Sequence, residues 1–235
     1  MEVLDNVPFR LDIEGMLKLS HVWGRNQHIE EVARELIDIA LPVARPRAVY
    51  EVSYVDNKNE DSLYINGIKF SSHVLRLNLD KVERVFPYVV TCGRELDQIA
   101  IPSSDLLRSY YMDVVREVVL HSARSYLGRY IREKYAVGQI SRMSPGSLPD
   151  WPLTQQKELF EVFGDVEGLI GVKLTDSFLM LPVKSLSGIY FPTEIKFESC
   201  QLCPRKACIG RRAAYAPELA RKYGGGNSSP FEGEK

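Results

Sequence analysis

Residues 172–191 read VKLTDSFLMLPVKSLSGIYF, and no other segment says more about the expected fold. Apolar and polar residues alternate in Val172–Leu181 and again in Leu186–Phe191, with Pro182 between them. This alternation predicts two strands joined by a short turn. Small residues lie among the apolar ones: Thr175, Ser177, Ser185, Ser187 and Gly188. Residues of this size let a ligand or a backbone approach closely, although the pattern alone favours an ordinary hairpin with one polar face.

The rest of the chain mixes helical and extended segments. A period near 3.6 predicts a helix over Asn26–Leu41 and a longer one over Ser104–Lys134, which Asp105 opens. A loop held by turns is expected over Ala136–Pro152, and a third strand near Thr193–Glu198. Strands and helices do not alternate regularly, which indicates an α+β fold rather than a parallel doubly wound sheet.

Composition limits the class of protein. The chain has 235 residues, of which 45% are hydrophobic and 26% charged, as in ordinary globular proteins. A net charge of −1 argues against a nucleic-acid binder. The sequence has neither a run of eighteen apolar residues nor a signal peptide at its start, so we expect a cytoplasmic protein with no membrane contact. In that compartment its four cysteines are expected to be thiols or metal ligands.

Two motifs resemble one known family. The stretch beginning at Gly171 is similar to the G-V-x-L-T-E-S-x-M-M-x-P-x-x-S-V-S-G-x-Y-F signature of the activation domain of cobalamin-dependent methionine synthase. Asp176 replaces the Glu of that signature, Leu179 a Met and Leu186 the Val. Upstream, RMSPG at residues 142–146 is similar to the R-x-(A/S)-P-G-Y loop of the family. The resemblance implies an α+β domain over residues 1–198, with a curved antiparallel sheet flanked by helices.

The resemblance also implies a function. The chain would bind S-adenosylmethionine and present its methyl group to the cobalamin of a separate methyltransferase protein, while a reductase supplies an electron. It has no D-x-H-x-x-G motif to hold cobalamin itself. Arg142 would bind the ligand carboxylate with its forked guanidinium. Ser144 and Gly146 belong to the same loop and would give backbone contacts, and Tyr190 and Phe191 would contact the ligand from the second strand. No residue is assigned a catalytic role.

Two acidic residues complete the implied set. Asp12 resembles an early Asp that meets the ligand amine, although a helix N-cap explains it equally well. The family has an acid on the long helix, where the simplest alignment places His121, with Glu117 one turn earlier. Ser147 replaces the Tyr that follows Pro-Gly. These departures keep a second interpretation open, in which the chain is a non-catalytic binding or assembly module that has lost S-adenosylmethionine.

A cysteine motif follows the last expected strand. Cys200, Cys203 and Cys208 have the spacing C-x-x-C-x4-C, and Cys92 is the only other cysteine. Three soft ligands need a fourth, which Cys92, His121 or water could supply. An iron–sulfur cluster, a structural zinc ion and unligated redox thiols all fit this spacing. A third interpretation is therefore an electron-transfer or metal-binding accessory protein.

The C-terminal extension, residues 199–223, is basic. Positive residues are frequent from Arg205 to Lys222, against the single acid Glu218. This segment could dock an acidic flavodoxin, ferredoxin or corrinoid protein, although a solvated positive face explains it equally well. The polar, glycine-rich residues 224–235 are predicted to be disordered.

Overall fold

The computed structural model describes residues 1–20, 27–208 and 210–224, and in it the chain divides into two units. Unit 1 consists of Met1–Glu51, Tyr88–Ala136 and Phe163–Ser187. Unit 2 consists of Val52–Pro87, Val137–Val162 and Gly188–Lys235. Two strands, β6 (Arg84–Thr91) and β10 (Ser185–Pro192), contain residues of both units. The predicted boundary at residue 198 follows the family resemblance and stays a prediction.

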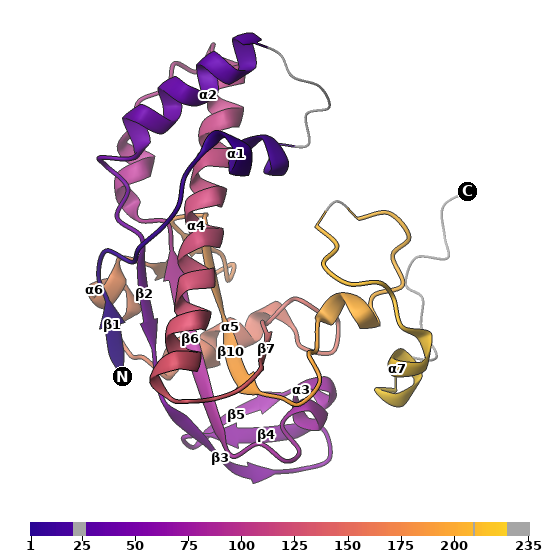
Figure 1. The fold of residues 1–235 in the computed structure, drawn as a ribbon. Helices are drawn as coiled ribbons and strands as arrows, with labels where there is room; N and C mark the ends of the chain where they lie inside the picture. Colours follow the sequence, from indigo (N-terminus) through magenta and orange to yellow (C-terminus); the bar gives the residue numbers. More distant parts are fainter. Residues whose placement is uncertain (21–26, 209, 225–235) are drawn as a thin grey trace. The chain divides into compact units, whose positions relative to one another are not determined.

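Unit 1 is built around one long helix (Figure 1). Its elements are β1 (Glu2–Leu4), α1 (Ile13–Leu19), α2 (Gln27–Ala40), β2 (Arg47–Tyr50), the 3-10 helix η1 (Arg94–Gln98), α4 (Leu106–Lys134), α6 (Val166–Ile170), β8 (Lys173–Leu174) and β9 (Met180–Leu181). The predicted N-cap of α4 is confirmed, because the Asp105 carboxylate accepts a hydrogen bond of 2.9 Å from the Arg108 N–H. Helices α1 and α2 contact α4 and each other.

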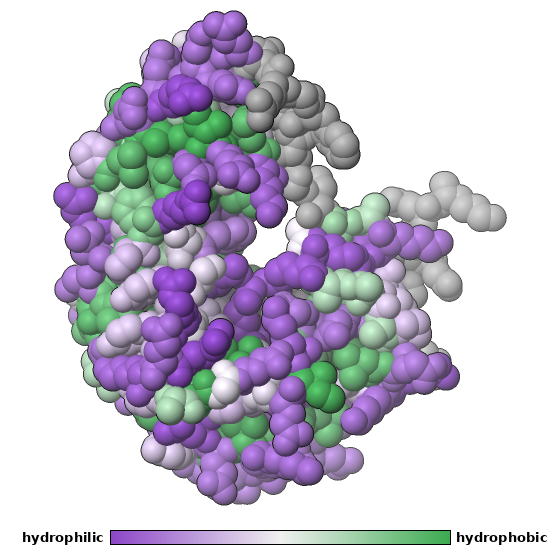
Figure 2. Space-filling view, in the orientation of Figure 1, coloured by the Kyte–Doolittle hydropathy of each residue, from purple (hydrophilic) through white to green (hydrophobic). Residues whose placement is uncertain are grey.

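The packing of unit 1 follows from amphipathic helices on a sheet. Strand β1 pairs antiparallel with β2, and β2 pairs antiparallel with β6. Helix α2 buries Val32, Leu36 and Ala40 at helical spacing and leaves its other face polar. Figure 2 shows hydrophilic residues on the outer side of α2 and a hydrophobic area between α2 and α1. The buried stripe of α2 therefore fixes how it packs in unit 1.

Unit 2 is an antiparallel sheet with short helices. Its elements are β3 (Ser53–Lys58), β4 (Ser62–Ile65), β5 (Ile68–Ser71), α3 (His73–Asn78), β7 (Ile140–Met143), the 3-10 helix η2 (Leu153–Gln155), α5 (Gln156–Glu161), the 3-10 helix η3 (Ser199–Leu202) and α7 (Pro217–Lys222). Strand β3 pairs with β4 and β6, β4 with β5, and β7 with β10, all antiparallel. The core contains Phe70 and Trp151, whose rings meet edge to face 6.3 Å apart. The predicted α+β class, with an antiparallel sheet and flanking helices, is confirmed.

The first half of the 172–191 stretch differs from the prediction. Val172–Leu181 is not one strand but the hairpin β8–β9, because the Leu179 N–H donates to Thr175 Oγ1 at 3.0 Å and the Thr175 N–H donates back to the Leu179 carbonyl at 2.8 Å. The small hydroxyl that suggested a ligand contact therefore closes a turn. The second half forms β10, as predicted.

Two further differences concern the partner of β10. The predicted loop Ala136–Pro152 contains the strand β7, which pairs with β10. The expected strand Thr193–Glu198 does not form; there the Phe197 N–H donates to Ser141 Oγ at 2.7 Å. Residues 225–235 of the predicted disordered tail lie outside the described residues. Within the parts of the chain that the structure describes, no helix has the length and apolar character needed to cross a membrane.

Candidate functional site

The first group of candidate residues lies on the strand pair β7–β10 of unit 2. Arg142 lies directly opposite Tyr190. Residues directly opposite on antiparallel strands project to the same face, and their chain neighbours project to the other face. Arg142 and Tyr190 therefore share one face, while Met143 and Ile189 point into the apolar core. The structure thus brings together two of the predicted contacts.

One nitrogen of the Arg142 guanidinium is a donor without an acceptor among the described residues. Its Nη2 atom is buried and has no hydrogen-bond partner among the described residues. A buried donor that is left unsatisfied costs free energy, and a guanidinium stays protonated in proteins. An anionic acceptor at this position would remove that cost, and a carboxylate matches the planar fork of the side chain.

The turn after β7 is tight. Gly146 has a φ of 78°, its N–H donates to the Trp151 carbonyl at 2.7 Å, and an added Cβ would meet Leu153 at 3.0 Å. The backbone angle therefore favours glycine, and a larger residue would press on the Leu153 side chain. Ser147, which replaces the Tyr of the family motif, donates through Oγ to the Ser144 carbonyl at 2.7 Å. The departure at Ser147 thus contributes to holding the turn in which Ser144 and Gly146 lie.

The structure buries Phe191, the other aromatic residue predicted to contact the ligand. Its side chain has no exposed surface and packs in the core of unit 2, on the face opposite Arg142. A buried core aromatic contributes packing to the unit. The alternation of β10 places only one of the two predicted aromatic residues, Tyr190, on the face of Arg142.

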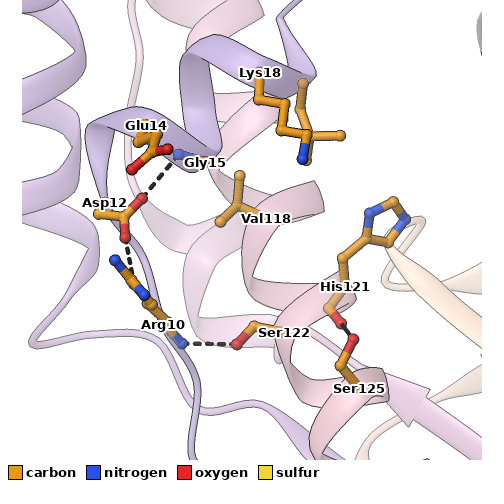
Figure 3. Close-up of a pocket in the computed structure, with 10 residues that line it drawn as sticks. Arg10, Asp12, Glu14, Gly15, Lys18, Val118, His121, Ser122 and Ser125 are labelled. Atoms are coloured by element: carbon orange, nitrogen blue, oxygen red, sulfur yellow. Dashed lines mark hydrogen bonds and ion pairs between the residues drawn. The ribbon is translucent and has the colours of Figure 1, made fainter.

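The second group lies in unit 1, in an open groove of about 460 Å³ between α1 and α4 (Figure 3). Figure 3 shows the Asp12 side chain at the start of α1, with His121 and Ser122 on α4. The Asp12 carboxylate accepts from the Gly15 N–H at 2.8 Å, so the predicted N-cap is confirmed. The same groove is lined by Arg10, Glu14, Lys18 and Ser125.

Asp12 remains ionised under ordinary conditions. The Gly15 N–H, followed by the hydrogen bond from Arg10, lowers the pKa of its carboxyl below the usual value. Arg10 is itself fixed to α4, because its backbone N–H donates to Ser122 Oγ at 2.7 Å. The N-cap and the ligand hypothesis are compatible, since one carboxylate oxygen serves the helix and the other faces a cation.

Glu117 forms an ion pair with a lysine, Lys184, that the sequence motifs did not indicate. Lys184 Nζ lies 3.2 Å from Glu117 and 2.9 Å from Asp113. Burial alone would lower the pKa of Lys184, but hydrogen bonds and charge from these two acids raise it overall. His121 Nε2 lies 3.9 Å from Glu117 and lines the groove, whereas Glu117 does not. In the sequence, the proximity of His121 to Glu117 is indicated by their spacing of one helical turn.

The cysteines do not form a metal cluster in the described residues. There, no three His, Cys, Asp or Glu side chains lie close enough to hold an ion. Cys92 is fully buried in unit 1, and burial, with the charge of Asp97, raises the pKa of its thiol to about 12. Cys200 and Cys203 are half-buried in unit 2 and Cys208 is exposed. The set of four predicted ligands is therefore not assembled among these residues.

Cys200 has a distinct environment. Burial alone would raise the pKa of its thiol, but the backbone N–H groups of Arg212 and Ala213 and the Arg212 charge lower it overall. Thiolates rather than thiols are nucleophiles and metal ligands, so this environment favours a reactive sulfur at Cys200.

Comparisons with known proteins identify one family model and one fold. Residues 122–198 match the model of the vitamin B12 dependent methionine synthase activation domain. The crystal structure of the MetH reactivation domain bound to AdoHcy has a similar fold, with a TM-score of 0.58 and 16% sequence identity over 85% of this chain and 81% of that one. No curated protein sequence matches this chain. The resemblance predicted from the two motifs is confirmed.

Proposed function

We propose, starting from the activation-domain match over residues 122–198, that this chain binds S-adenosylmethionine and supports the reductive methylation of cobalamin carried by a separate protein. The similar MetH reactivation domain was solved with AdoHcy, the product that remains when S-adenosylmethionine gives up its methyl group. The electron comes from a separate donor, for which a flavodoxin or ferredoxin is the proposed class.

One observation carries the proposal most strongly: the buried Arg142 Nη2 has no partner among the described residues. S-adenosylmethionine has an α-carboxylate, which is the acceptor that a guanidinium fork binds best. Tyr190 lies directly opposite Arg142 on β10, and the Ser144–Gly146 turn fixes the end of β7. The residues present therefore fit an amino-acid carboxylate.

The role of the chain is to bind and orient the methyl donor. The methyl group is supplied by S-adenosylmethionine, and its transfer depends on near in-line placement. Asp12 remains the predicted contact for the ligand amine, since it is an ionised carboxylate at the edge of an open groove. Glu117 is the weaker prediction, because Lys184 already neutralises it.

Titration of the full chain with S-adenosylmethionine by calorimetry tests the proposal. We expect Arg142→Ala to weaken binding by about 10- to 100-fold, since hydrogen bonds to charged groups are worth about 1.5–3 kcal/mol. Arg34→Ala is the matched control, because Arg34 is exposed and its ion-pair partner among the described residues is Glu30 at 4.0 Å. Its affinity should equal that of the wild type.

Two outcomes would contradict the proposal. If the wild type does not bind S-adenosylmethionine, the chain is a non-catalytic module that keeps only the fold. If Arg142→Ala binds as well as the wild type, the carboxylate is held elsewhere. Unfolding of Arg142→Ala by urea should match the wild type within about 1 kcal/mol, since no internal partner of Nη2 is lost.

A further inference from the structure

The cysteine segment of unit 2 is ordered by an arginine. Arg211 donates to the carbonyl oxygens of Cys200 at 3.2 Å and Cys203 at 3.3 Å. It also donates to the carbonyls of Ala213 and Arg205. A single guanidinium therefore ties together the backbone on both sides of the C-x-x-C motif, which accounts for the loop geometry without a bound ion.

The local helix places Cys200 and Cys203 above one another. Cys200 lies in the 3-10 helix η3, and Cys203 follows its last residue. The Cys203 N–H donates to the Cys200 carbonyl at 3.3 Å, which is the bond of a 3-10 turn. In such a turn residues three apart are eclipsed and rise by about 6 Å, which lies within the Cα separation of a disulfide. The Cα separation expected for this turn is therefore compatible with a disulfide between the two residues.

The surroundings of Cys200 and Cys203 differ, and this difference indicates which of the two thiols attacks first. The backbone N–H groups of Arg212 and Ala213, and the Arg212 side chain, lower the pKa of the Cys200 thiol. Cys200 is half-buried, so a small reagent can reach it. Hydrogen bonds and a cation of this kind favour a nucleophilic sulfur. Cys203 has the position of a resolving thiol, one turn away.

We propose that Cys200 and Cys203 form a dithiol site that reduces disulfide substrates, with Cys200 as the attacking sulfur and Cys203 as the resolving one. The proposal does not depend on binding of S-adenosylmethionine.

The chemistry balances without a further reactant. The Cys200 thiolate attacks one sulfur of the substrate disulfide, the substrate S–S bond breaks, and the first half leaves as a thiol after taking a proton. Cys203 then attacks the Cys200 sulfur, and the mixed disulfide breaks to release the second half. The substrate gains two electrons and two protons, and the chain loses them as the Cys200–Cys203 disulfide forms.

Oxidised glutathione is the probe, added to the full chain after complete reduction and removal of the reductant. Mass spectrometry under non-reducing conditions should find a Cys200–Cys203 disulfide in the wild type, with no glutathione attached. Cys203→Ser should keep one glutathione on Cys200, because the resolving thiol is absent. Cys208→Ser should behave as the wild type, and Cys200→Ser should form neither product.

Rates give the second measurement. Cys200 in Cys203→Ser should react at least about tenfold faster than the exposed Cys208 at neutral pH. Arg211→Gln should slow this reaction, because the carbonyls of Cys200 and Cys203 are no longer tied. Arg221→Gln is the matched control, since Arg221 is exposed and pairs only with Glu218. It should leave the rate unchanged.

Three results would overturn the proposal. They are equal rates at Cys200 and Cys208, a disulfide that involves Cys208 in the wild type, and stoichiometric zinc or iron in the purified chain that must be removed before the thiols react. The last would show that the segment is a metal site instead.

Discussion

Glu2 shows how much one carboxylate can organise in unit 1. Its oxygens accept from Tyr50 at 2.6 Å and Tyr130 at 2.5 Å, and from the ammonium group of Lys134. Burial alone would raise the pKa of Glu2, but these hydrogen bonds and the Lys134 charge lower it to about 2. The ionised carboxylate therefore holds β1 to the C-terminal end of α4.

This network predicts the pH dependence of stability. The pKa of Glu2 lies below its usual 4.5, so the unfolded chain binds the proton first as the pH falls. The stabilisation is complete above about pH 4.5 and is lost as the pH falls to about 2. Glu2→Gln should lower the free energy of unfolding by about 2 kcal/mol at pH 7, with the difference shrinking towards pH 2.

Urea unfolding at a series of pH values measures this effect. Glu161→Gln, at an exposed position of α5, should keep the wild-type profile. A Glu2→Gln variant with the same pH profile as the wild type would show that the network does not carry the stabilisation.

Individual site residues could be predicted to different degrees. Arg142 was predicted because it lies in a short motif whose neighbours also match, and Asp12 only because it resembles an early Asp of the family. The burial of Phe191 could not be read from the motif, since it depends on which face of β10 meets the core. The partner of Glu117 could not be predicted either, because Lys184 is 67 residues away in the chain.

At the scale of elements, α3 begins with the help of a distant residue. Asp150 accepts from the N–H groups of His73 at 3.1 Å and Val74 at 3.0 Å, and from the Ser72 hydroxyl. Ser72 in turn caps the Leu75 N–H at 2.9 Å. The free N–H groups of a first helical turn are thus satisfied by the turn that follows β7.

Removal of this cap should destabilise the chain. Asp150→Ala leaves two backbone donors and one hydroxyl without their acceptor, so the free energy of unfolding should fall by about 1–3 kcal/mol. Asp38→Ala, at an exposed position of α2, should change it by less than about 0.5 kcal/mol. Equal urea midpoints for the two variants would contradict the proposed cap.

Elements whose signals are local could be predicted, and those made by distant pairing could not. Helix α4 was found from its period and its Asp105 cap, both within one segment. Strand β7 was missed because only its pairing with β10 makes it a strand. Within Val172–Leu181, the alternation predicted a strand, but a hydrogen bond to the side chain of Thr175 forms a turn there.

The whole molecule consists of two units, each with antiparallel strands and helices. The proposed ligand site is inferred from the family resemblance. The match over residues 122–198 includes the end of α4, β7 and β10, and therefore the segment that contains Arg142 and Tyr190. The fold class could be predicted because both motifs lie in this segment. The division into units could not, since it depends on contacts among segments far apart in sequence.

The central claim is that Arg142 binds the carboxylate of S-adenosylmethionine. Its most direct test compares S-adenosylmethionine with decarboxylated S-adenosylmethionine in calorimetric titrations of the wild type and Arg142→Ala. The account predicts that the wild type binds the carboxylate form at least about 10-fold more tightly, and that Arg142→Ala no longer distinguishes the two ligands. An equal preference in both proteins would contradict it, because the carboxylate would then be bound by another residue.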